Sequence, residues 1–445
     1  MTTTTEVCLR AVLLSTMTFA GTGGCTSGEP DQPVLEIAQA LGDSLGGIAP
    51  DDFAAARDAF NTVEELGDGL GPIFNERACG NCHTLGAQGG AGEQIERRFG
   101  RFLNSGFDPM ESSGGSLRQL FTVGTFTRSD GQICTVPQEV EPAEATVHDV
   151  GRLTTPLFGL GLVDAMPDSF FDGLAAAEPP EQRGIVNRVS ILLPNPDDPS
   201  QSPGGTRVGR FGWKAGISNL TQFAADAYIN EMGITTQSCI GGVSILAFAT
   251  ESAPSGVPQP DGCDDLALPA PDGIPAGTDD AVGSCDGGLT EIQDDVDEFA
   301  TFMTFLAPPT RGPITPDVEA GEPIFVAVGC QVCHTPTTFV TPASTGNGVP
   351  GNTAFNPFSD FLVHDMGALG DQIGNPGDSV AATQRMRTAP LWGIRVRNKL
   401  LHDGRTNDIG AAILAHDGQG AAARDAFSQL GAADQHSLIE YVRSL

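Results

Sequence analysis

Two short segments of the same form constrain this chain more than any other feature of its sequence. Each has two cysteines separated by two residues and followed directly by a histidine. This pattern is typical of a c-type haem, in which both thiols bond to the porphyrin and the imidazole binds the iron. Zinc would need further ligands at matching spacing, and neither segment has them nearby. The sequence therefore predicts two covalent c-type haems, held by Cys79, Cys82 and His83 and by Cys330, Cys333 and His334.

The stretches that precede the two segments also match. Phe74 ends a Pro-Ile-Phe sequence five residues before Cys79, and Phe325 ends the same sequence five residues before Cys330. We interpret this internal repeat as two cytochrome c-like folds, each of which delivers its haem helix after a packed aromatic side chain. We therefore expect a mainly α protein with two cytochrome c-like helical haem domains, long loops and a small inserted β-hairpin.

Apolar periodicity and turn residues place the other elements. Phe53, Ala56 and Phe60 recur at helical spacing after Asp51 and Asp52, which we expect to cap the helix. Further helices are expected at residues 168–177, 219–232, 299–306, 409–415 and 432–445. Residues 185–193 and 206–213 flank a turn rich in Pro, Asp and Gly and predict the hairpin. Two prolines after residue 307 separate a first haem domain, residues 51–308, from a second, residues 309–445.

The first 50 residues are interpreted as an export signal and a spacer. Arg10 is followed by a short apolar run and then by small residues before Cys25. The run is too short to span a membrane, as expected of a signal peptide. Residues 1–25 therefore predict an exported, periplasmic protein, and Cys25 resembles the lipid-anchor site of a bacterial lipoprotein. Residues 26–50 are expected to form a flexible tether.

Residues 236–297 are expected to form an acidic insertion in the first domain. They contain Cys239, Cys263 and Cys285, which with Cys134 make four cysteines outside the haem segments and the signal. In an oxidising compartment an even number favours two disulfides, and the pairing is left open. Calcium binding by the aspartates of this insertion is an alternative to a solvated acidic loop, although their spacing is not that of an EF-hand.

The charge balance excludes one class of partner. The chain has 23 Lys and Arg against 56 Asp and Glu, a net charge of -33. No basic face is available to neutralise phosphates, which excludes nucleic acid. Such a surface is compatible either with solubility alone or with attraction of a basic electron-donor protein.

Several longer motifs accompany the haem segments. They are Arg210-Phe211-Gly212-Trp213-Lys214-Ala215, Asn230-Glu231-Met232-Gly233, Leu362-Val363-His364-Asp365-Met366-Gly367, Thr388-Ala389-Pro390-Leu391-Trp392-Gly393 and Leu401-His402-Asp403-Gly404-Arg405. Together they resemble the di-haem oxidoreductase family, within the superfamily of bacterial di-haem cytochrome c peroxidases and MauG. The resemblance covers residues 70–445.

The resemblance implies an activity and a set of residues. Hydrogen peroxide or another small oxidant would be reduced at the first haem, with electrons relayed through the second haem. The electrons would come from an external donor such as a small cytochrome or cupredoxin. Trp213 would lie between the haems, with Gln222 and Glu231 on the open face of the first, where Glu231 acts as acid and base. Gln222 falls one residue short of the family spacing. A solvent-facing helical acid and a core aromatic are the alternative interpretations of Glu231 and Trp213.

Axial ligation departs from that of the ordinary peroxidases. The residue fourteen after His402 is His416, where those relatives have a methionine that binds the second iron. We therefore expect His334 and His416 to ligate that iron, with Met366 as the alternative ligand. Imidazole in place of thioether lowers the reduction potential. No histidine lies between His83 and His148, so the first iron is expected to be five-coordinate or water-bound, with His148 as the competing sixth ligand.

Two other functions remain open at this point. One is a MauG-like or rubber-oxygenase-like oxidation of an organic or protein substrate. The other is a plain di-haem electron-transfer cytochrome in which both irons are six-coordinate.

Overall fold

The structure is a computed structural model in which all described residues belong to one compact unit. It describes residues 35–36, 40–65, 70–71, 73–113, 115–127, 131–195, 197–234, 236–238, 245–247, 292–293 and 295–445. The predicted signal peptide with Cys25, and Cys239, Cys263 and Cys285, lie outside the described residues. So does most of the acidic insertion. The boundary after residue 308 stays a prediction.

The first hydrophobic cluster forms around α1 (Pro50–Asn61), α5 (Leu220–Ala227) and α6 (Val296–Phe305). Helix α1 buries Phe53, Ala56 and Phe60, as its periodicity predicts, and the ring centroids of Phe60 and Phe302 are 4.7 Å apart. The helix begins after Ala49 without a side-chain cap. Asp51 and Asp52 lie within its first turn, where their negative charges interact favourably with the positive end of the helix dipole. Their side chains do not cap the helix.

Part of the expected tether is packed against this cluster. Leu45 is buried, and its backbone N–H donates to the carbonyl of Phe305 at 2.6 Å. The N–H of Ala307 donates to the carbonyl of Asp43 at 3.0 Å. Residues 43–45 are therefore bonded to the end of α6.

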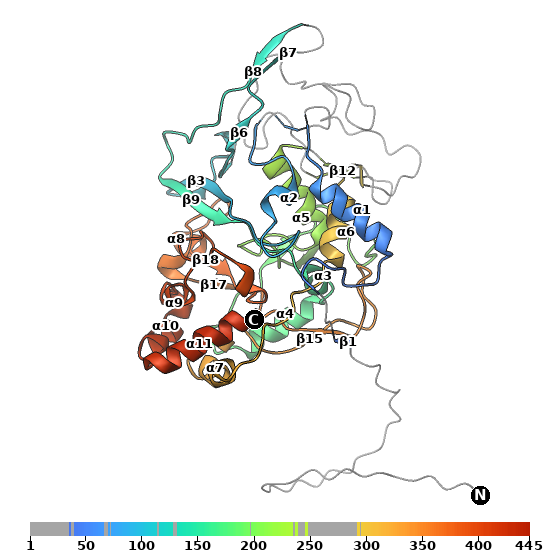
Figure 1. Cartoon of the computed structure of the whole chain (residues 1–445). Coiled ribbons are helices and arrows are strands. Elements are labelled where there is room, and N and C mark those ends of the chain that lie inside the picture. The colour runs from blue at the N-terminus through green and yellow to red at the C-terminus, as the bar shows by residue number, and fades with distance from the viewer. Residues whose placement is uncertain are drawn as a thin grey trace, which may run out of the picture. The chain divides into compact units, whose positions relative to one another are not determined.

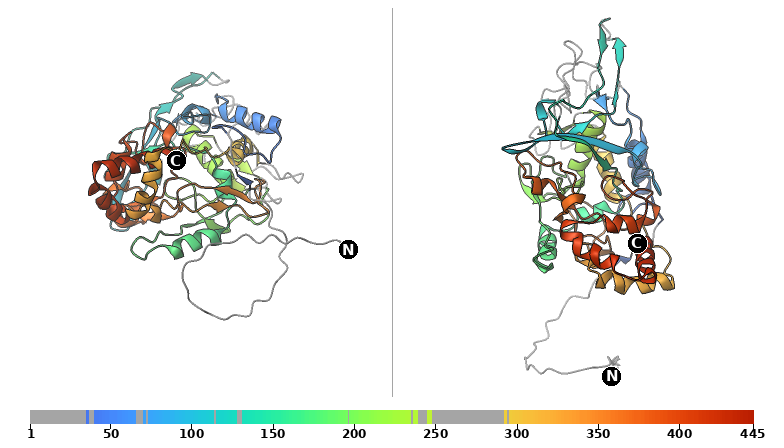
Figure 2. Two further views of the ribbon diagram at one scale, coloured as in Figure 1. Left: turned by 60° about the horizontal axis from the view of Figure 1, so that its bottom comes forward. Right: turned by 90° about the vertical axis from the view of Figure 1, so that its left-hand side faces the viewer.

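The second hydrophobic cluster surrounds the packed pair α7 (Pro316–Ala327) and α11 (Ala432–Ser444), which lie side by side in the orange and red part of the chain (Figures 1 and 2). The ring centroids of Phe325 and Tyr441 are 5.2 Å apart at this contact. A Cβ on Gly321 would lie 2.1 Å from the carbonyl oxygen of Ser437, so only glycine permits the close approach of the two helices.

Strands make up more of the molecule than the sequence analysis predicts. Within the described residues they form seven small sheets. The largest contains β3 (Ile95–Leu103), paired with β4 (Gly106–Asp108), β5 (Leu117–Arg118) and β9 (Val147–Leu153). The expectation of a mainly α fold is therefore wrong, and the fold is mixed α and β. No strand was predicted in residues 84–147, which are rich in glycine overall, and β3 finds its partner β9 more than forty residues away.

The internal repeat takes two different structures. Phe74 lies in strand β2 (Ile73–Phe74), which pairs with β6 (Phe121–Thr122), whereas Phe325 lies on helix α7. Both side chains are buried. The repeated sequence therefore preserves a packed aromatic side chain before each haem segment, while the partner segments decide the backbone conformation.

The predicted hairpin is present as β10 (Arg188–Ser190) and β11 (Thr206–Val208). The remaining helices are α2 (Cys79–Cys82), α3 (Leu160–Asp164), α4 (Asp168–Ala177), α8 (Val380–Thr383), α9 (Ile409–Leu414) and α10 (Ala421–Ser428). The remaining strands are β1 (Leu35–Glu36), β7 (Thr125–Thr127), β8 (Ile133–Thr135), β12 (Thr236–Ser238), β13 (Ile245–Ala247), β14 (Ile292–Gln293), β15 (Phe339–Val340), β16 (Thr353–Phe355), β17 (Val363–Asp365) and β18 (Arg385–Arg387).

Two further observations concern export and the membrane. Cys134 in β8 is disulfide-bonded, and its partner lies outside the described residues. Among the described helices, none is long and apolar enough to cross a membrane.

Candidate functional site

The first haem segment lines a cavity of about 400 Å³. Cys79 and Cys82 begin and end α2, and His83 follows with its backbone N–H bonded to the carbonyl of Cys79 at 3.1 Å. The Nδ1 atom of His83 lies 3.0 Å from the carbonyl oxygen of Gly90. Because a carbonyl only accepts, Nδ1 carries the proton and Nε2 keeps its lone pair. This arrangement orients an imidazole for metal binding.

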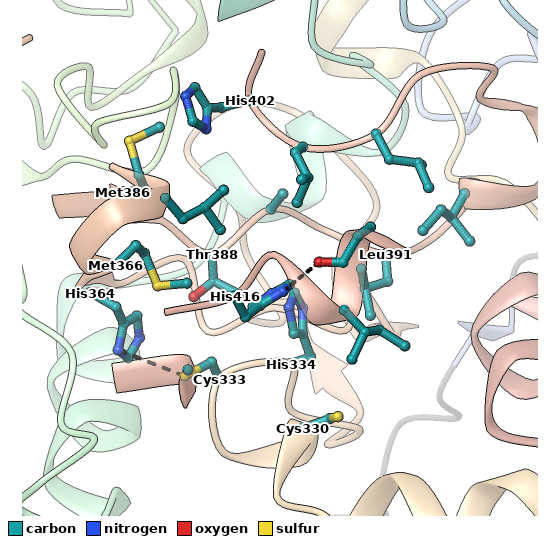
Figure 3. A pocket seen from close by; sticks show the side chains of 18 of the residues that line it. Cys330, Cys333, His334, His364, Met366, Met386, Thr388, Leu391, His402 and His416 are labelled. Carbon is teal, nitrogen blue, oxygen red and sulfur yellow. Dashed lines mark hydrogen bonds between the residues drawn. The ribbon is translucent and has the colours of Figure 1, made fainter. Parts of the chain in front are cut away.

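The second haem segment lines a separate cavity of about 200 Å³ (Figure 3). The Nδ1 atom of His334 lies 3.0 Å from the carbonyl oxygen of Phe358, and that of His416 lies 2.9 Å from the carbonyl oxygen of Ala412. Both imidazoles therefore have the same tautomer as His83, with a free Nε2. Helix α9 ends just before His416 and holds it opposite His334.

The spacing of these two rings fits one metal ion between them. Their centroids are 6.4 Å apart. Two imidazoles bound to one ion from opposite sides would have centroids about 6.4 Å apart, because a metal–nitrogen bond is about 2.0 Å and the nitrogen lies about 1.2 Å from the ring centre. The predicted pair of His334 and His416 is therefore geometrically suited to a bis-histidine iron. Met366 lines the same cavity and stays the alternative ligand.

Burial keeps the three histidines neutral. It lowers the pKa of His83 and of His334 to about 4, and it lowers the pKa of His416. A neutral imidazole retains the lone pair that a metal ligand needs.

Two arginines that line the second cavity fit the carboxylates of a haem. Arg387 is buried, and its Nε donates to the carbonyl of Gly212 at 2.7 Å. Arg397 donates from Nη2 to the carbonyl of Pro390 at 2.9 Å, while its buried Nε finds no hydrogen-bond partner in the described parts of the chain. Neither guanidinium has a carboxylate within ion-pair distance among the described residues. A haem propionate would supply the missing anionic acceptor.

Trp213 lies between the two cavities and lines both. Its indole Nε1 donates to the carbonyl of Leu153 at 2.8 Å, and the N–H of Leu153 donates to the carbonyl of His402 at 2.6 Å. The ring centroids of Trp213 and His402 are 6.2 Å apart with the rings nearly perpendicular. The tryptophan is thus anchored at the boundary between the cavities.

Glu231 lines the first cavity from a π-helical turn, Tyr228–Met232, that continues α5. Such turns are frequently found at functional sites. Asn75 donates from Nδ2 to Oε2 of Glu231 at 2.9 Å. Burial, together with the negative charge of Glu96, raises the pKa of Glu231 to about 8. Glu231 is therefore protonated at neutral pH, so it is a proton donor in the resting state.

Glu96 and Arg98 line this cavity as well, and the sequence analysis missed them. Both lie on β3, where residues two apart share a face. Arg98 donates to both oxygens of Glu96, at 2.9 and 3.0 Å. The alternation of polar side chains at positions 94, 96 and 98 was an available signal, but no strand was expected there.

Two other predicted candidates lie elsewhere. Gln222 does not line the first cavity; its side-chain oxygen accepts the N–H of Leu192 at 3.0 Å. His148 is exposed on β9 and bonds to Glu141. Among the described residues that line the first cavity, His83 is the only histidine.

A buried ion cluster holds the segment next to Trp213 in place. Asp371 is buried and accepts from Lys214 Nζ at 2.6 Å and from Arg152 Nε at 2.7 Å. We expect Asp371→Asn to lower the free energy of unfolding by about 3–5 kcal/mol, because it leaves two buried cations without their carboxylate. Urea denaturation measures this loss, and Asp58→Asn on the exposed face of α1 is the control.

The cations hold the pKa of Asp371 at about 2. This pKa is below the unfolded value of about 3.9, so the stabilisation is present above pH 4 and is lost as the pH falls through 2. An Asp371→Asn variant with the stability of the control would contradict this account.

Comparisons with known proteins identify one family. The sequence model of the family described as "Di-haem oxidoreductase, putative peroxidase" matches residues 143–445, which include the second haem segment but not the first. No curated protein matches the chain. A structure of hydrazine synthase from Kuenenia stuttgartiensis under xenon pressure shares 12% identity over 94% of this chain and 100% of that chain. Its TM-score of 0.34 is too low to carry an argument.

Proposed function

This chain belongs to the di-haem oxidoreductase family, and we propose that it reduces hydrogen peroxide or another small oxidant at its first haem. One observation carries the proposal, namely that the two cavities are unlike. The first is lined by one histidine and by Glu231, whose pKa is raised, whereas the second is lined by four histidines, of which His334 and His416 face each other. An iron held between two histidines would have no free position for a substrate, so chemistry would belong to the first cavity and electron relay to the second.

The site supports a proposal for the residues that would hold each haem. Cys79 and Cys82 would hold the first haem by thioether bonds, with His83 as the axial ligand. Cys330 and Cys333 would hold the second, with His334 and His416 as its axial ligands. The bound haems would supply the two electrons that, with two protons, convert hydrogen peroxide into two water molecules.

The chain's own residues handle protons and position. Glu231 would donate a proton to the oxygen that leaves as water, which is the role of a general acid. Trp213 would bridge the two cavities, and the carbonyl of Leu153 fixes the plane of its ring. An external donor, a small cytochrome or cupredoxin, would restore the electrons, and the net charge of -33 favours a basic one.

We also propose export to the periplasm, as residues 1–25 predict, with Cys25 as a lipid-anchor site. The possible calcium site among the aspartates of residues 236–297 lies mostly outside the described residues. The one cluster of possible metal-binding groups among the described residues is Cys333, Asp360 and His364, and it includes a predicted haem-attachment cysteine.

Mass spectrometry and EPR test the proposal together. The purified protein should keep two haems after denaturation, and the ferric spectrum should show one high-spin and one low-spin haem in equal amounts. High spin is expected of the iron with one histidine, and low spin of the iron with two. A Cys79→Ser/Cys82→Ser variant should lose the high-spin signal selectively and keep the low-spin one.

Each alternative function predicts a different result in these experiments. A wholly low-spin protein that stays so after the second haem is reduced would contradict the proposal and favour an electron-transfer cytochrome. A high-spin haem without rapid turnover of peroxide and a reducing donor would favour oxidation of an organic or protein substrate.

A further inference from the structure

The first cavity is lined by two carboxyl groups that lie close enough to influence each other's ionisation. Glu96 reaches it from β3, and Glu231 from the π-helical turn after α5. Two neighbouring carboxyl groups rarely ionise together, because their like charges repel each other. We therefore expect the pair to hold one proton and one negative charge.

The neighbours of the pair decide where the proton lies. Arg98 binds both oxygens of Glu96, the geometry that suits an ionised carboxylate. Within the part of the chain that the structure describes, no cation binds Glu231 in this way, and Glu231 accepts a bond from the neutral amide of Asn75. The positive charge of Arg98 lowers the pKa of Glu96, while burial and the charge of Glu96 raise that of Glu231. Glu96 is thus the base and Glu231 the acid.

Other charged groups face the pair from three elements. Arg152 on β9 lies directly opposite Glu96 in the strand register and forms its ion pair with Asp371. Asp226 on α5 lies near Arg98, and burial raises its pKa to about 6. Cys79 and Cys82 on α2 also face Glu231, but they are neutral as thiols and as thioethers. Of these groups, only Asp226 is expected to titrate near neutral pH.

We propose that Glu96 is the second catalytic residue of this site, so that two carboxyl groups divide the acid and base roles. This inference rests on the proposed function. Glu96 would take one proton of the bound peroxide while Glu231 donates its proton to the oxygen that leaves as water. The O–O bond and one O–H bond break while one O–H bond forms, and the bound haems would supply the two electrons that this cleavage requires. The second oxygen then leaves as water after it takes up two protons from solvent. The proton on Glu96 returns to Glu231, so the net charge of the pair is unchanged.

Infrared spectroscopy tests the shared proton without any turnover. The wild-type protein at pH 7 should show the C=O stretch of a buried carboxylic acid, and the band should be absent from Glu231→Gln. The band should also shift to another frequency in Glu96→Gln, because Glu231 loses the neighbouring negative charge that, together with burial, retains its proton. Glu93→Gln, an exposed glutamate three residues before Glu96, should leave the band unchanged.

Kinetics test the catalytic role. Glu96→Gln should slow peroxide reduction by about 10²-fold or more, the usual contribution of a general base. The Glu96→Gln/Glu231→Gln double variant should be no slower than the slower single variant, because groups that act as one unit are not additive. Glu93→Gln should match the wild type.

A second variant distinguishes a loss of catalysis from a loss of folding. Glu96→Gln leaves Arg98 without its partner, so Glu96→Gln/Arg98→Gln, which removes both charges, should be measured beside it. Both variants should keep two haems.

The outcomes separate this inference from the proposed function. A Glu96→Gln variant that keeps the infrared band at its wild-type frequency and turns over peroxide at the wild-type rate would overturn the inference and leave the peroxidase function standing. A wild-type protein that shows the band but does not react with peroxide would overturn the function and the catalytic role of Glu96, while the shared proton would stand.

Discussion

Glu231→Gln should lower the turnover of peroxide by about 10²–10⁴-fold, the usual contribution of a general acid or base. The amide keeps the shape of the side chain and can still accept the bond from Asn75, but it cannot donate an acidic proton. The high-spin ferric signal should persist, because Glu231 is not proposed as an iron ligand. Steady-state peroxide consumption with a saturating donor measures the rate, and EPR measures the spin state.

The pH dependence of peroxide turnover should also reflect the role of Glu231 as an acid. Because the pKa of Glu231 is raised to about 8, the wild-type rate should be high below pH 8 and fall as the pH rises through it and the acid loses its proton. Glu231→Gln should lack this fall. Glu139 is a matched control, since it is a buried glutamate with a raised pKa that does not line the cavity. If Glu231→Gln turned over peroxide as Glu139→Gln does, the acid would have to be sought elsewhere.

His416→Met should raise the reduction potential of the second haem by tenths of a volt, a part of the roughly 0.8 V that axial ligands span. Thioether ligation favours the reduced iron more than imidazole does. The ring of His416 lies 6.4 Å from that of His334 by centroids, so a thioether in the same place would remain within reach of the iron. Spectroelectrochemistry measures the potential, and a sulfur–iron charge-transfer band should appear in the ferric spectrum.

Met366 provides the control for this prediction because it lines the same cavity. Met366→Leu should leave the potential and the spectrum close to those of the wild type. If His416→Met left both unchanged and Met366→Leu changed them, the ligand would be Met366 and the second iron would be ligated by one histidine and one methionine.

Local sequence patterns predicted several helices, one hairpin and the two haem segments of this protein. Helices α1, α4, α9 and α11 were found close to their predicted ranges. Apolar residues at helical spacing form one face that packs against the core, and this pattern is visible in the local sequence. The hairpin of β10 and β11 follows from a turn between two short apolar runs. The haem segments could be predicted because two thiols and an imidazole at fixed spacing within five consecutive residues are specific for the attachment of a c-type haem. The predicted cap of α1 was wrong, because the helix begins at Pro50 and Asp51 is its second residue.

Only the tertiary structure decided how the cavities are built. Glu96 and Arg98 reach the first cavity because β3 pairs with β9, a partner distant in the sequence, and no local pattern states which strands will pair or in which register. Trp213 lies between the cavities because Leu153, sixty residues away, accepts its indole N–H. The same holds for His334 and His416, whose separation depends on how α9 packs. The sequence alone identified the groups that can hold two haems, and long-range packing determined which acids and which aromatic ring stand beside each one.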